Sequence, residues 1–260
     1  IVELDDGTHV GRGECEPHEW DEKESERVKE QIEALRSEIQ TGLNREQLLN
    51  HLPAGPARNA LDCALWDLEA SRSACRAWQI AGLELTKPLL TAFTIGIDSP
   101  EAMAKKAAGN RDKQLLKLKL GLDGCVERVK AVRVASPQAR LIVDANEAWT
   151  FDALMHYSSR LSELGVELIE QPLPHGQDDF LVNYTGPVPL CADESCLDRT
   201  SLAQLINKYA FINIKLDKTG GLTEALLLAA EAKKAGFGIM VGCMLGTSLA
   251  MAPAMVVAAI

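Results

Sequence analysis

Acidic residues end three consecutive apolar segments of this 260-residue sequence. Asp144 follows Leu-Ile-Val, Glu170 follows Glu-Leu-Ile and Asp193 follows Leu-Cys-Ala, at intervals of 26 and 23 residues. Three carboxylates that converge cannot all stay ionised without a nearby cation. Because oxygen-only ligands suit a hard ion such as Mg²⁺, these three residues are predicted to bind a metal. The alternative is that each carboxylate only caps the helix that follows it.

Lysines lie on either side of these carboxylates in the sequence. Between Leu115 and Leu120, the two-residue period of a strand puts three leucines on one face and Lys117 and Lys119 on the other. Lys215 ends a later apolar segment. Two ammonium groups that lie close together lower each other's pKa, so we expect a lysine base that works near neutral pH. The alternative is an edge strand with solvated lysines.

A cation with a lysine on each side fits the removal of a proton α to a carboxylate. Such a carbon acid is weak, and the ion offsets the negative charge that develops on the enediolate oxygens. With a base on each face, the proton leaves from one side and returns on the other. A site of this kind inverts a stereocentre.

Seven apolar segments, each followed by a helix-like stretch, must position these residues. They predict strands at 91–97, 115–120, 140–145, 167–171, 188–192, 211–216 and 238–243. Alternating strands and helices predict parallel βαβ units. From Thr94 onward, the polar residues at the strand ends recur every 22 to 26 residues. They meet at one mouth if the strands close into a barrel, whereas an open doubly wound sheet would spread them in a row.

The first 86 residues have a different pattern and predict a small α+β domain. An Asp-Gly turn predicts a hairpin at 1–15. Apolar residues at helical spacing predict one helix at 22–39 and another from Pro56 onward. The predicted organisation is therefore an α+β domain at 1–86 and a βα barrel domain at 87–260. The last apolar stretch, 250–260, is expected to form a buried helix.

Composition narrows the range of partners. The net charge of −10 argues against a nucleic-acid partner, and no apolar run reaches the roughly 18 to 20 residues that a membrane helix needs. The first residues lack the features of a signal peptide. Seven cysteines without a C-x-x-C pair indicate reduced thiols in a cytoplasmic protein. We therefore expect a small-molecule substrate and neither nucleic acid nor membrane as a partner, with a homo-oligomer left open.

Five motifs together resemble the muconate-lactonising subgroup of the enolase superfamily over essentially the whole chain. They are Leu-Lys-Leu-Lys (116–119), Val-Asp-Ala-Asn (143–146), Ile-Glu-Gln-Pro (169–172), Ala-Asp-Glu-Ser (192–195) and Asn-Ile-Lys-Leu-Asp-Lys-Thr-Gly-Gly-Leu (213–222). The resemblance implies a (β/α)7β-type barrel of the TIM-like kind with an N-terminal α+β capping domain, and Mg²⁺ as cofactor. It also implies metal ligation by Asp144, Glu170 and Asp193.

The same resemblance assigns roles to the lysines and to the substrate contacts. Lys119 and Lys215 become the opposed acid/base pair, and Lys117 tunes Lys119 and helps to hold a substrate carboxylate. The segment Val-Gly-Cys-Met-Leu-Gly-Thr-Ser at 241–248 is similar to that of dipeptide epimerases, whose typical substrate is L-Ala-D/L-Glu from peptidoglycan turnover. The residues expected to contact the substrate are Lys117, Thr94, Cys243 and Met244. The alternative for the last two is a seventh strand with a buried Cys and Met.

Other activities and missing segments complete the expectations. The subgroup's fold also serves o-succinylbenzoate synthases, N-acylamino acid racemases and cycloisomerases, and an inactive metal-binding scaffold is the non-enzymatic alternative. Dipeptide epimerases carry an Asp-x-Asp motif on an eighth strand, and no Asp follows Asp217 here. The hairpin at Ile1 is similar to the second and third strands of the family cap. We therefore expect the native protein to have an eighth barrel strand and a first cap strand beyond the printed sequence, since a barrel with seven strands has an open seam.

Overall fold

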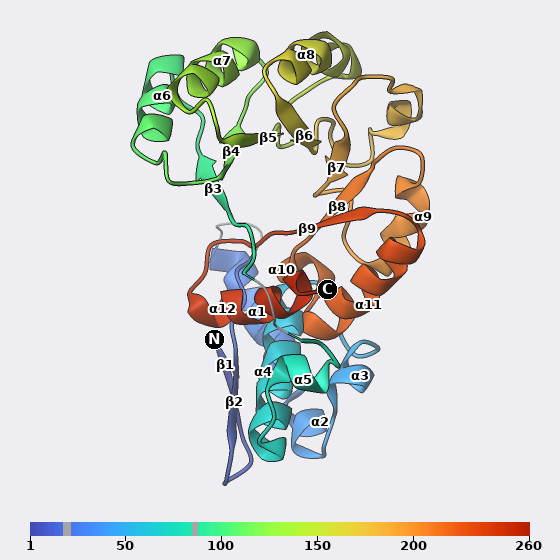
Figure 1. The fold of residues 1–260 in the computed structure, drawn as a ribbon. Coiled ribbons are helices and arrows are strands. Elements are labelled where there is room, and N and C mark those ends of the chain that lie inside the picture. Colours follow the sequence, from blue (N-terminus) through green and yellow to red (C-terminus); the bar gives the residue numbers. More distant parts are fainter. Residues whose placement is uncertain (18–21, 85–87) are drawn as a thin grey trace. The chain divides into compact units, whose positions relative to one another are not determined.

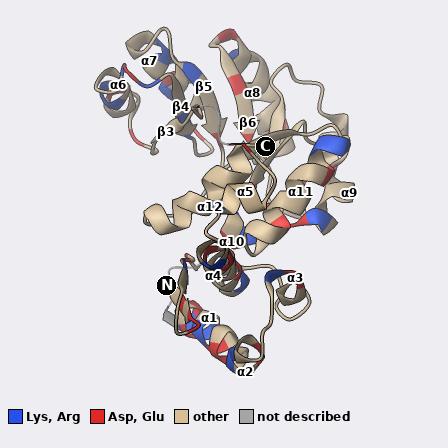
Figure 2. Ribbon diagram, turned by 60° about the horizontal axis from the view of Figure 1, so that its bottom comes forward, with Lys and Arg blue, Asp and Glu red and all other residues tan. Residues whose placement is uncertain are grey.

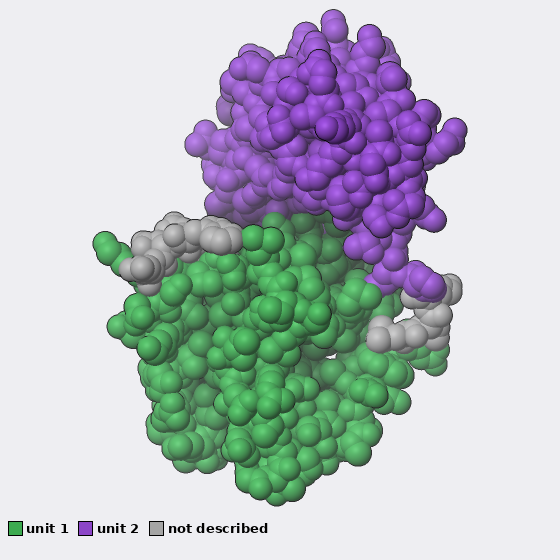
Figure 3. Space-filling view, turned by 90° about the vertical axis from the view of Figure 1, so that its left-hand side faces the viewer, with its two compact units in different colours: residues 1–87, 197–202, 213–260 green, residues 88–196, 203–212 purple. Residues whose placement is uncertain are grey.

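The computed structural model describes residues 1–17, 22–84 and 88–260 (Figure 1). Two compact units make up the chain, and Figure 3 colours them separately. Unit 1 consists of residues 1–87, 197–202 and 213–260, and unit 2 consists of residues 88–196 and 203–212. The predicted division into an α+β domain at 1–86 and a βα barrel domain at 87–260 stays a prediction.

Unit 2 is built from strands that alternate with helices. Its elements are β3 (Ala92–Ile95), α6 (Pro100–Ala108), β4 (Leu115–Lys119), α7 (Cys125–Ala135), β5 (Arg140–Asp144), α8 (Phe151–Glu163), β6 (Val166–Glu170), η1 (Asp179–Asn183) and β7 (Leu190–Ala192). Two further elements, α9 (Leu202–Leu205) and β8 (Phe211–Ile214), have residues in both units. Ser99 and Thr150 are the N-cap residues of α6 and α8, and the side chain of each accepts a hydrogen bond from a backbone N–H of the first helical turn.

Seven strands form one sheet in the order β3-β4-β5-β6-β7-β8-β9, with β9 at Gly238–Val241. Neighbours from β3 to β8 are parallel. Each of the seven predicted segments overlaps one strand of this sheet, so the seven strands are confirmed. In β4, Leu116 and Leu118 are buried on one face and Lys117 and Lys119 lie on the other, as the two-residue period predicts. The register aligns Lys119 with Asp144 and Asp144 with Glu170. The ends of three adjacent strands therefore carry charged residues side by side.

Unit 1 combines the N-terminal hairpin with helices from both ends of the sequence. Its elements are β1 (Val2–Asp5), β2 (Val10–Gly13), α1 (Glu22–Ala34), α2 (Arg36–Gln40), α3 (Arg45–Leu48), α4 (Pro56–Ser73), α5 (Ala77–Ile80), η2 (Arg199–Ser201), α10 (Leu216–Thr219), α11 (Leu222–Lys234), β9 and α12 (Ser248–Ala258). The hairpin and the helix from Pro56 are confirmed. The single helix predicted at 22–39 is wrong in one respect, because the chain leaves helical geometry at Leu35 and forms α1 and α2.

Helix α4 is the centre of unit 1. Strand β2 packs on it so closely that a Cβ added at Gly13 would lie 2.0 Å from the carbonyl O of Ala60. Only glycine permits that approach. On another side of the helix, Leu61 packs with Leu35 and Leu48 in a small apolar core. Helix α4 thus joins the hairpin to the preceding helices.

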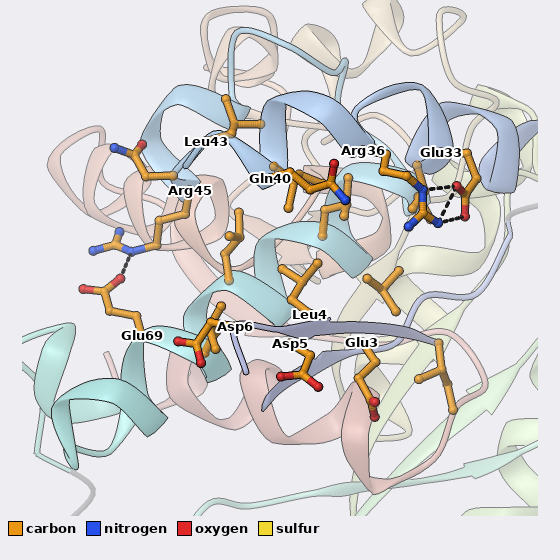
Figure 4. A pocket seen from close by; sticks show the side chains of 18 of the residues that line it. Glu3, Leu4, Asp5, Asp6, Glu33, Arg36, Gln40, Leu43, Arg45 and Glu69 are labelled. Carbon is orange, nitrogen blue, oxygen red and sulfur yellow. Dashed lines mark hydrogen bonds and ion pairs between the residues drawn. The ribbon is translucent and has the colours of Figure 1, made fainter. Parts of the chain in front are cut away.

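A cavity of about 1470 Å³ lies in unit 1, lined by the hairpin and by helices α1 to α4 (Figure 4). Apolar side chains such as Leu4 and Leu43 line it together with two ion pairs. Arg36 pairs with Glu33 at 2.6 Å and Arg45 with Glu69 at 2.8 Å. None of the residues predicted to bind a metal or to transfer protons is among its lining residues.

Helix α12 corresponds to the apolar stretch that the sequence predicts as a buried helix. Figure 2 shows no charged residue along it. The helix is confirmed, but its predicted burial is wrong, because only Val256 and Val257 are buried and Met255 is half exposed. Among the described residues, no helix has both the length and the apolar character needed to cross a membrane.

Candidate active site

Three buried carboxylates occupy the ends of adjacent strands in unit 2. Asp144 and Glu170 are the last residues of β5 and β6, and Asp193 directly follows β7. All three are fully buried. Parallel strands end at a common edge of their sheet, so the fold itself brings these residues to one place.

The lysines of β4 point into the same group of carboxylates. Lys117 Nζ lies 2.9 Å from Asp144 Oδ2 and 2.6 Å from Glu170 Oε2, and Lys119 Nζ lies 2.7 Å from Asp144 Oδ2. Thr94 on β3 is paired with Lys117 in the sheet and is exposed. Five predicted site residues therefore lie on the four adjacent strands β3 to β6. They are Thr94, Lys117, Lys119, Asp144 and Glu170.

Burial and neighbouring charges change the pKa values in this group. Burial raises the pKa of Glu170 to about 7, and the charge of Asp144 acts in the same direction. Burial alone would lower the pKa of Lys117, but the charges of Glu170 and Asp144 and their hydrogen bonds outweigh it and raise that pKa above its ordinary value. The prediction that neighbouring ammonium groups lower the pKa is therefore wrong for Lys117, because carboxylates and not Lys119 are its nearest charges.

The donor set suits a hard divalent cation in its chemistry. It offers three buried carboxylates, and the charges of Asp144 and Asp193 add to burial in raising the pKa of Glu170, so a cation would be stabilised beside them. Among the described residues, no three Asp, Glu, His or Cys side chains already surround a common point at metal-binding distances. The Lys117 ammonium lies between Asp144 and Glu170 instead. A metal ion that bound both carboxylates would take the place of that ammonium.

Asn146 and Glu194 also lie among these residues, although neither was predicted to have a role. Asn146 has a left-handed backbone (φ +41°), and its Oδ1 accepts a hydrogen bond from Lys119 Nζ at 2.6 Å. Its Nδ2 donates to Glu194 Oε1 at 3.1 Å. Burial, and then the charge of Asp193, raise the pKa of Glu194. Asn146 comes two positions after Asp144, and Glu194 comes one position after Asp193. This closeness to predicted metal ligands could have identified both residues from the sequence.

The remaining predicted residues belong to unit 1. Lys215 directly follows β8 and forms the N-cap position of α10. Cys243 and Met244 come after the end of β9 at Val241, and Cys243 is exposed. The alternative reading of these two residues as part of a buried strand is therefore wrong, because they lie in the loop between β9 and α12.

Contacts at both ends hold that loop in place. A Cβ at Gly242 would lie 2.6 Å from Asn213 Oδ1, so the backbone passes against this side chain. At the other end, Thr247 donates its N–H to Glu14 at 2.8 Å and its hydroxyl to the same carboxylate. Glu14 was not predicted to matter. The position of the loop at 242–247 is thus fixed partly by the hairpin region of unit 1.

The amino-acid sequence of this chain is similar to those of known proteins. Residues 101–260 match the protein family described as Enolase C-terminal domain-like. The chain is 46% identical over 257 residues to the L-Ala-D/L-Glu epimerase of Escherichia coli strain K12, a match that covers 98% of this chain and 80% of that protein. It is 45% identical over 264 residues to the N-acetyl-D-glutamate racemase of Pseudoalteromonas sp., with coverage of 99% and 82%.

A solved structure gives the same result for the fold. The dipeptide epimerase of Enterococcus faecalis V583, complexed with Mg and the dipeptide L-Leu-L-Tyr, matches with a TM-score of 0.88 at 31% sequence identity. The match covers 96% of this chain and 76% of that one. The similarity therefore extends through both compact units of the chain.

Proposed function

Because this chain belongs to the enolase superfamily, we propose that it is a Mg²⁺-dependent epimerase that inverts the glutamate α-carbon of L-Ala-D/L-Glu or a related dipeptide. One observation carries this proposal. Two lysines converge on buried carboxylates at the ends of β4, β5 and β6, which is the arrangement that proton transfer next to a carboxylate requires. The 46% identity to an L-Ala-D/L-Glu epimerase supports the choice of substrate.

Membership of the superfamily also bears on the fold. The predicted α/β class, a barrel-type arrangement of βα units with an N-terminal α+β cap, is confirmed by the similarity to the solved dipeptide epimerase. The resemblance that the sequence motifs suggest is likewise confirmed.

In this proposal Asp144, Glu170 and Asp193 hold the Mg²⁺ ion. When bound, the ion neutralises the negative charge that develops on the carboxylate oxygens of the substrate. The structure of the Enterococcus faecalis relative with Mg supports the choice of metal. Lys117, whose ammonium lies between Asp144 and Glu170 in this structure, would then be the partner of the substrate carboxylate.

The two other lysines move the proton. Lys119 takes it from one face of the α-carbon, and Lys215 returns a proton to the opposite face, so the configuration inverts. Asn146 accepts a hydrogen bond from Lys119 Nζ at 2.6 Å and thereby holds this nitrogen in a fixed direction. For the reverse reaction the two lysines exchange roles.

A second candidate activity is racemisation of an N-acylated glutamate such as N-acetylglutamate. The 45% identity to an N-acetyl-D-glutamate racemase supports it. L-Ala-Glu is itself an N-acylated glutamate, and the two substrates share the carbon acid and differ only in the acyl group. The dipeptide additionally offers an ammonium group, so the preference depends on a carboxylate or carbonyl that binds this group.

The finer assignments follow from the same proposal. Thr94, Cys243 and Met244 contact the substrate. The partner is a small molecule and not a nucleic acid or a membrane, which the net charge of −10 supports, and a homo-oligomer stays open. A role in peptidoglycan recycling and a cytoplasmic location are consistent with an L-Ala-D/L-Glu substrate.

Deuterium uptake tests the function. The purified protein is incubated with L-Ala-L-Glu, L-Ala-D-Glu or N-acetyl-L-glutamate in heavy water with Mg²⁺, and exchange at the glutamate α-carbon is followed by NMR. We expect exchange with inversion for the dipeptides, loss of both on addition of EDTA, and recovery with Mg²⁺. Exchange of N-acetylglutamate alone would favour the second candidate, and no exchange of any of the three would contradict the proposed substrate class.

A further inference from the structure

Gln171 is the residue that directly follows Glu170, and its side chain is fully buried. Its backbone is left-handed (φ +34°), and its N–H donates to the carbonyl O of Cys191 at 2.8 Å. The side-chain Oε1 accepts hydrogen bonds from two N–H groups, of Asp193 at 2.9 Å and of Ser195 at 3.1 Å. One amide therefore joins the residue next to Glu170 to the backbone of Asp193.

Hydrogen-bond chemistry fixes the orientation of this amide. Since two backbone N–H donors meet the same atom, that atom must be the oxygen and the other must be the nitrogen. Nε2 accordingly has two hydrogens to share among three oxygens, the carbonyl O of Leu173 at 2.8 Å, Ser195 Oγ at 2.9 Å and Tyr209 Oη at 3.1 Å. The amide has only one orientation in which these partners are satisfied.

Asp178 ends the chain of donors that starts at Gln171. Ser195 Oγ and Tyr209 Oη both donate to Asp178 Oδ2, at 2.7 and 2.9 Å, and Lys208 Nζ lies 3.3 Å from Asp178 Oδ1. Burial raises the pKa of Asp178, but these three hydrogen bonds outweigh it, and the pKa lies below its ordinary value. Because the ionised Asp178 carboxylate can only accept hydrogen bonds, the hydroxyl groups of Ser195 and Tyr209 donate to it and accept from Gln171.

We propose that Gln171 is a positioning residue of the cation site, and that Asp178 is its anchor. Gln171 sets the spacing between Glu170, through the main chain, and Asp193, through its side chain. This inference rests on the proposed function, because it takes both carboxylates as metal ligands. Groups behind the ligands of a metal commonly change its affinity 10- to 100-fold when they are mutated.

A purely structural role makes a different prediction. If the network only stabilised the segments after β6 and β7, its loss would lower the free energy of unfolding and leave the ion preference unchanged. If the network sets the spacing of the metal ligands, its loss should weaken the binding of Mg²⁺ more than the binding of Ca²⁺. Mg²⁺ requires near-ideal octahedral geometry, whereas Ca²⁺ tolerates irregular sites.

The test uses Gln171→Met in the full chain, with Mg²⁺ and Ca²⁺ alone as probes in isothermal titration calorimetry. We expect the Kd for Mg²⁺ to rise about 10- to 100-fold, with a smaller rise for Ca²⁺. Tyr184→Phe is the control, because it removes a half-buried polar group of unit 2 outside the network, a hydroxyl that donates to the carbonyl O of Val188 at 2.7 Å. This control should lower the midpoint of thermal unfolding and leave both Kd values unchanged.

Asp178→Asn is the second variant and covers the case in which Gln171→Met does not fold. It keeps the shape of the anchor and removes its charge, so we expect the same change in ion preference with a smaller, few-fold rise in the Kd for Mg²⁺. A folded variant of either kind with the wild-type Kd values for both ions overturns the inference, while wild-type exchange activity leaves the proposed function intact. A wild-type protein that binds no Mg²⁺ overturns both.

Discussion

Two buried polar clusters of this protein use similar residues in opposite ways. In unit 1, the α4 cluster of Asn59, Asp62, Trp66, Asp217 and Thr223 joins α4 to α10 and α11, and the carboxylates of Asp62 and Asp217 accept hydrogen bonds from neutral groups. Asn59 Nδ2 donates to Asp217 Oδ1 at 2.7 Å, while Asp62 accepts from the Thr223 N–H at 2.9 Å and from its hydroxyl at 2.6 Å. Trp66 Nε1 donates to the same hydroxyl at 2.8 Å.

In unit 2, the carboxylate cluster of Asp144, Glu170 and Asp193 meets ammonium groups instead. Lys117 bridges two of its carboxylates, and the pKa of Glu170 is raised to about 7. Neutral donors suit a contact that only has to hold helices together. A surplus of buried negative charge instead creates a place for a cation, which is the role that we propose for the carboxylate cluster.

Asp144→Asn should have the largest effect, because it removes one charge from the carboxylate cluster and preserves its shape. We expect the kcat/KM for epimerisation to fall about a thousandfold or more, since a metal ion contributes several kcal/mol of charge stabilisation. Mg²⁺ affinity, measured by calorimetry, should fall in parallel. Asp62→Asn is the matched control, the same chemical change in the α4 cluster, and should leave both quantities unchanged. Wild-type Mg²⁺ affinity in Asp144→Asn would remove the distinction between the clusters.

The α4 cluster should show itself in the pH dependence of stability. Burial raises the pKa of Asp62 from 3.8 to about 6, although hydrogen bonds from Thr223 oppose this. Because the folded state has the higher pKa, the stability due to the bound proton is fully present below about pH 4 and is lost as the pH rises through 6. Two pKa units correspond to about 3 kcal/mol.

Urea unfolding of the wild type and of Asp62→Asn at several pH values measures this effect. Between pH 4 and pH 7, the free energy of unfolding of the wild type should fall by about 3 kcal/mol relative to that of the variant. Parallel pH profiles for the two proteins would show that Asp62 ionises in the folded state as readily as in the unfolded chain.

The carboxylate cluster should instead couple protons to metal. Glu170 must lose its proton to bind Mg²⁺, so the apparent affinity should fall about tenfold per pH unit below pH 7 and level off above it. In the metal-free protein, the proton on Glu170 stabilises the fold below about pH 4.5, and this contribution is lost as the pH rises through 7. The rise in melting temperature caused by Mg²⁺ should therefore be larger at pH 8 than at pH 6. An affinity that does not change with pH would contradict the raised pKa.

The sequence predicted the strands well, because each is an apolar segment bounded by breaks. Several predicted segments continue one or two residues too far, and the physical reason lies at the strand ends. Gln171 has a left-handed backbone, and Leu216 begins α10. Both residues continue the alternation of polar and apolar side chains that predicts a strand, but their backbones have already left the sheet. The break at Leu35 escaped prediction because the apolar spacing continues through it.

The charged residues of the site could be predicted because their types and their spacing of one per βα unit are written in the sequence. The hydrogen bonds that hold them could not. Gln171 reaches Tyr209, 38 residues later, and Asn146 reaches Glu194, 48 residues later. The pKa of Lys117 was misjudged for the same reason, since it depends on Asp144 and Glu170, which approach it only in the folded sheet.

Stereospecific isotope exchange in two lysine variants tests most directly whether the carboxylate cluster serves two-base proton transfer. Lys119→Ala and Lys215→Ala are each incubated in heavy water with Mg²⁺ and with L-Ala-L-Glu or L-Ala-D-Glu. We expect both variants to lose epimerisation about 10²- to 10⁴-fold and each to retain exchange of one diastereomer, a different one for each variant. Exchange of the same diastereomer by both, or continued epimerisation without either lysine, would contradict the mechanism.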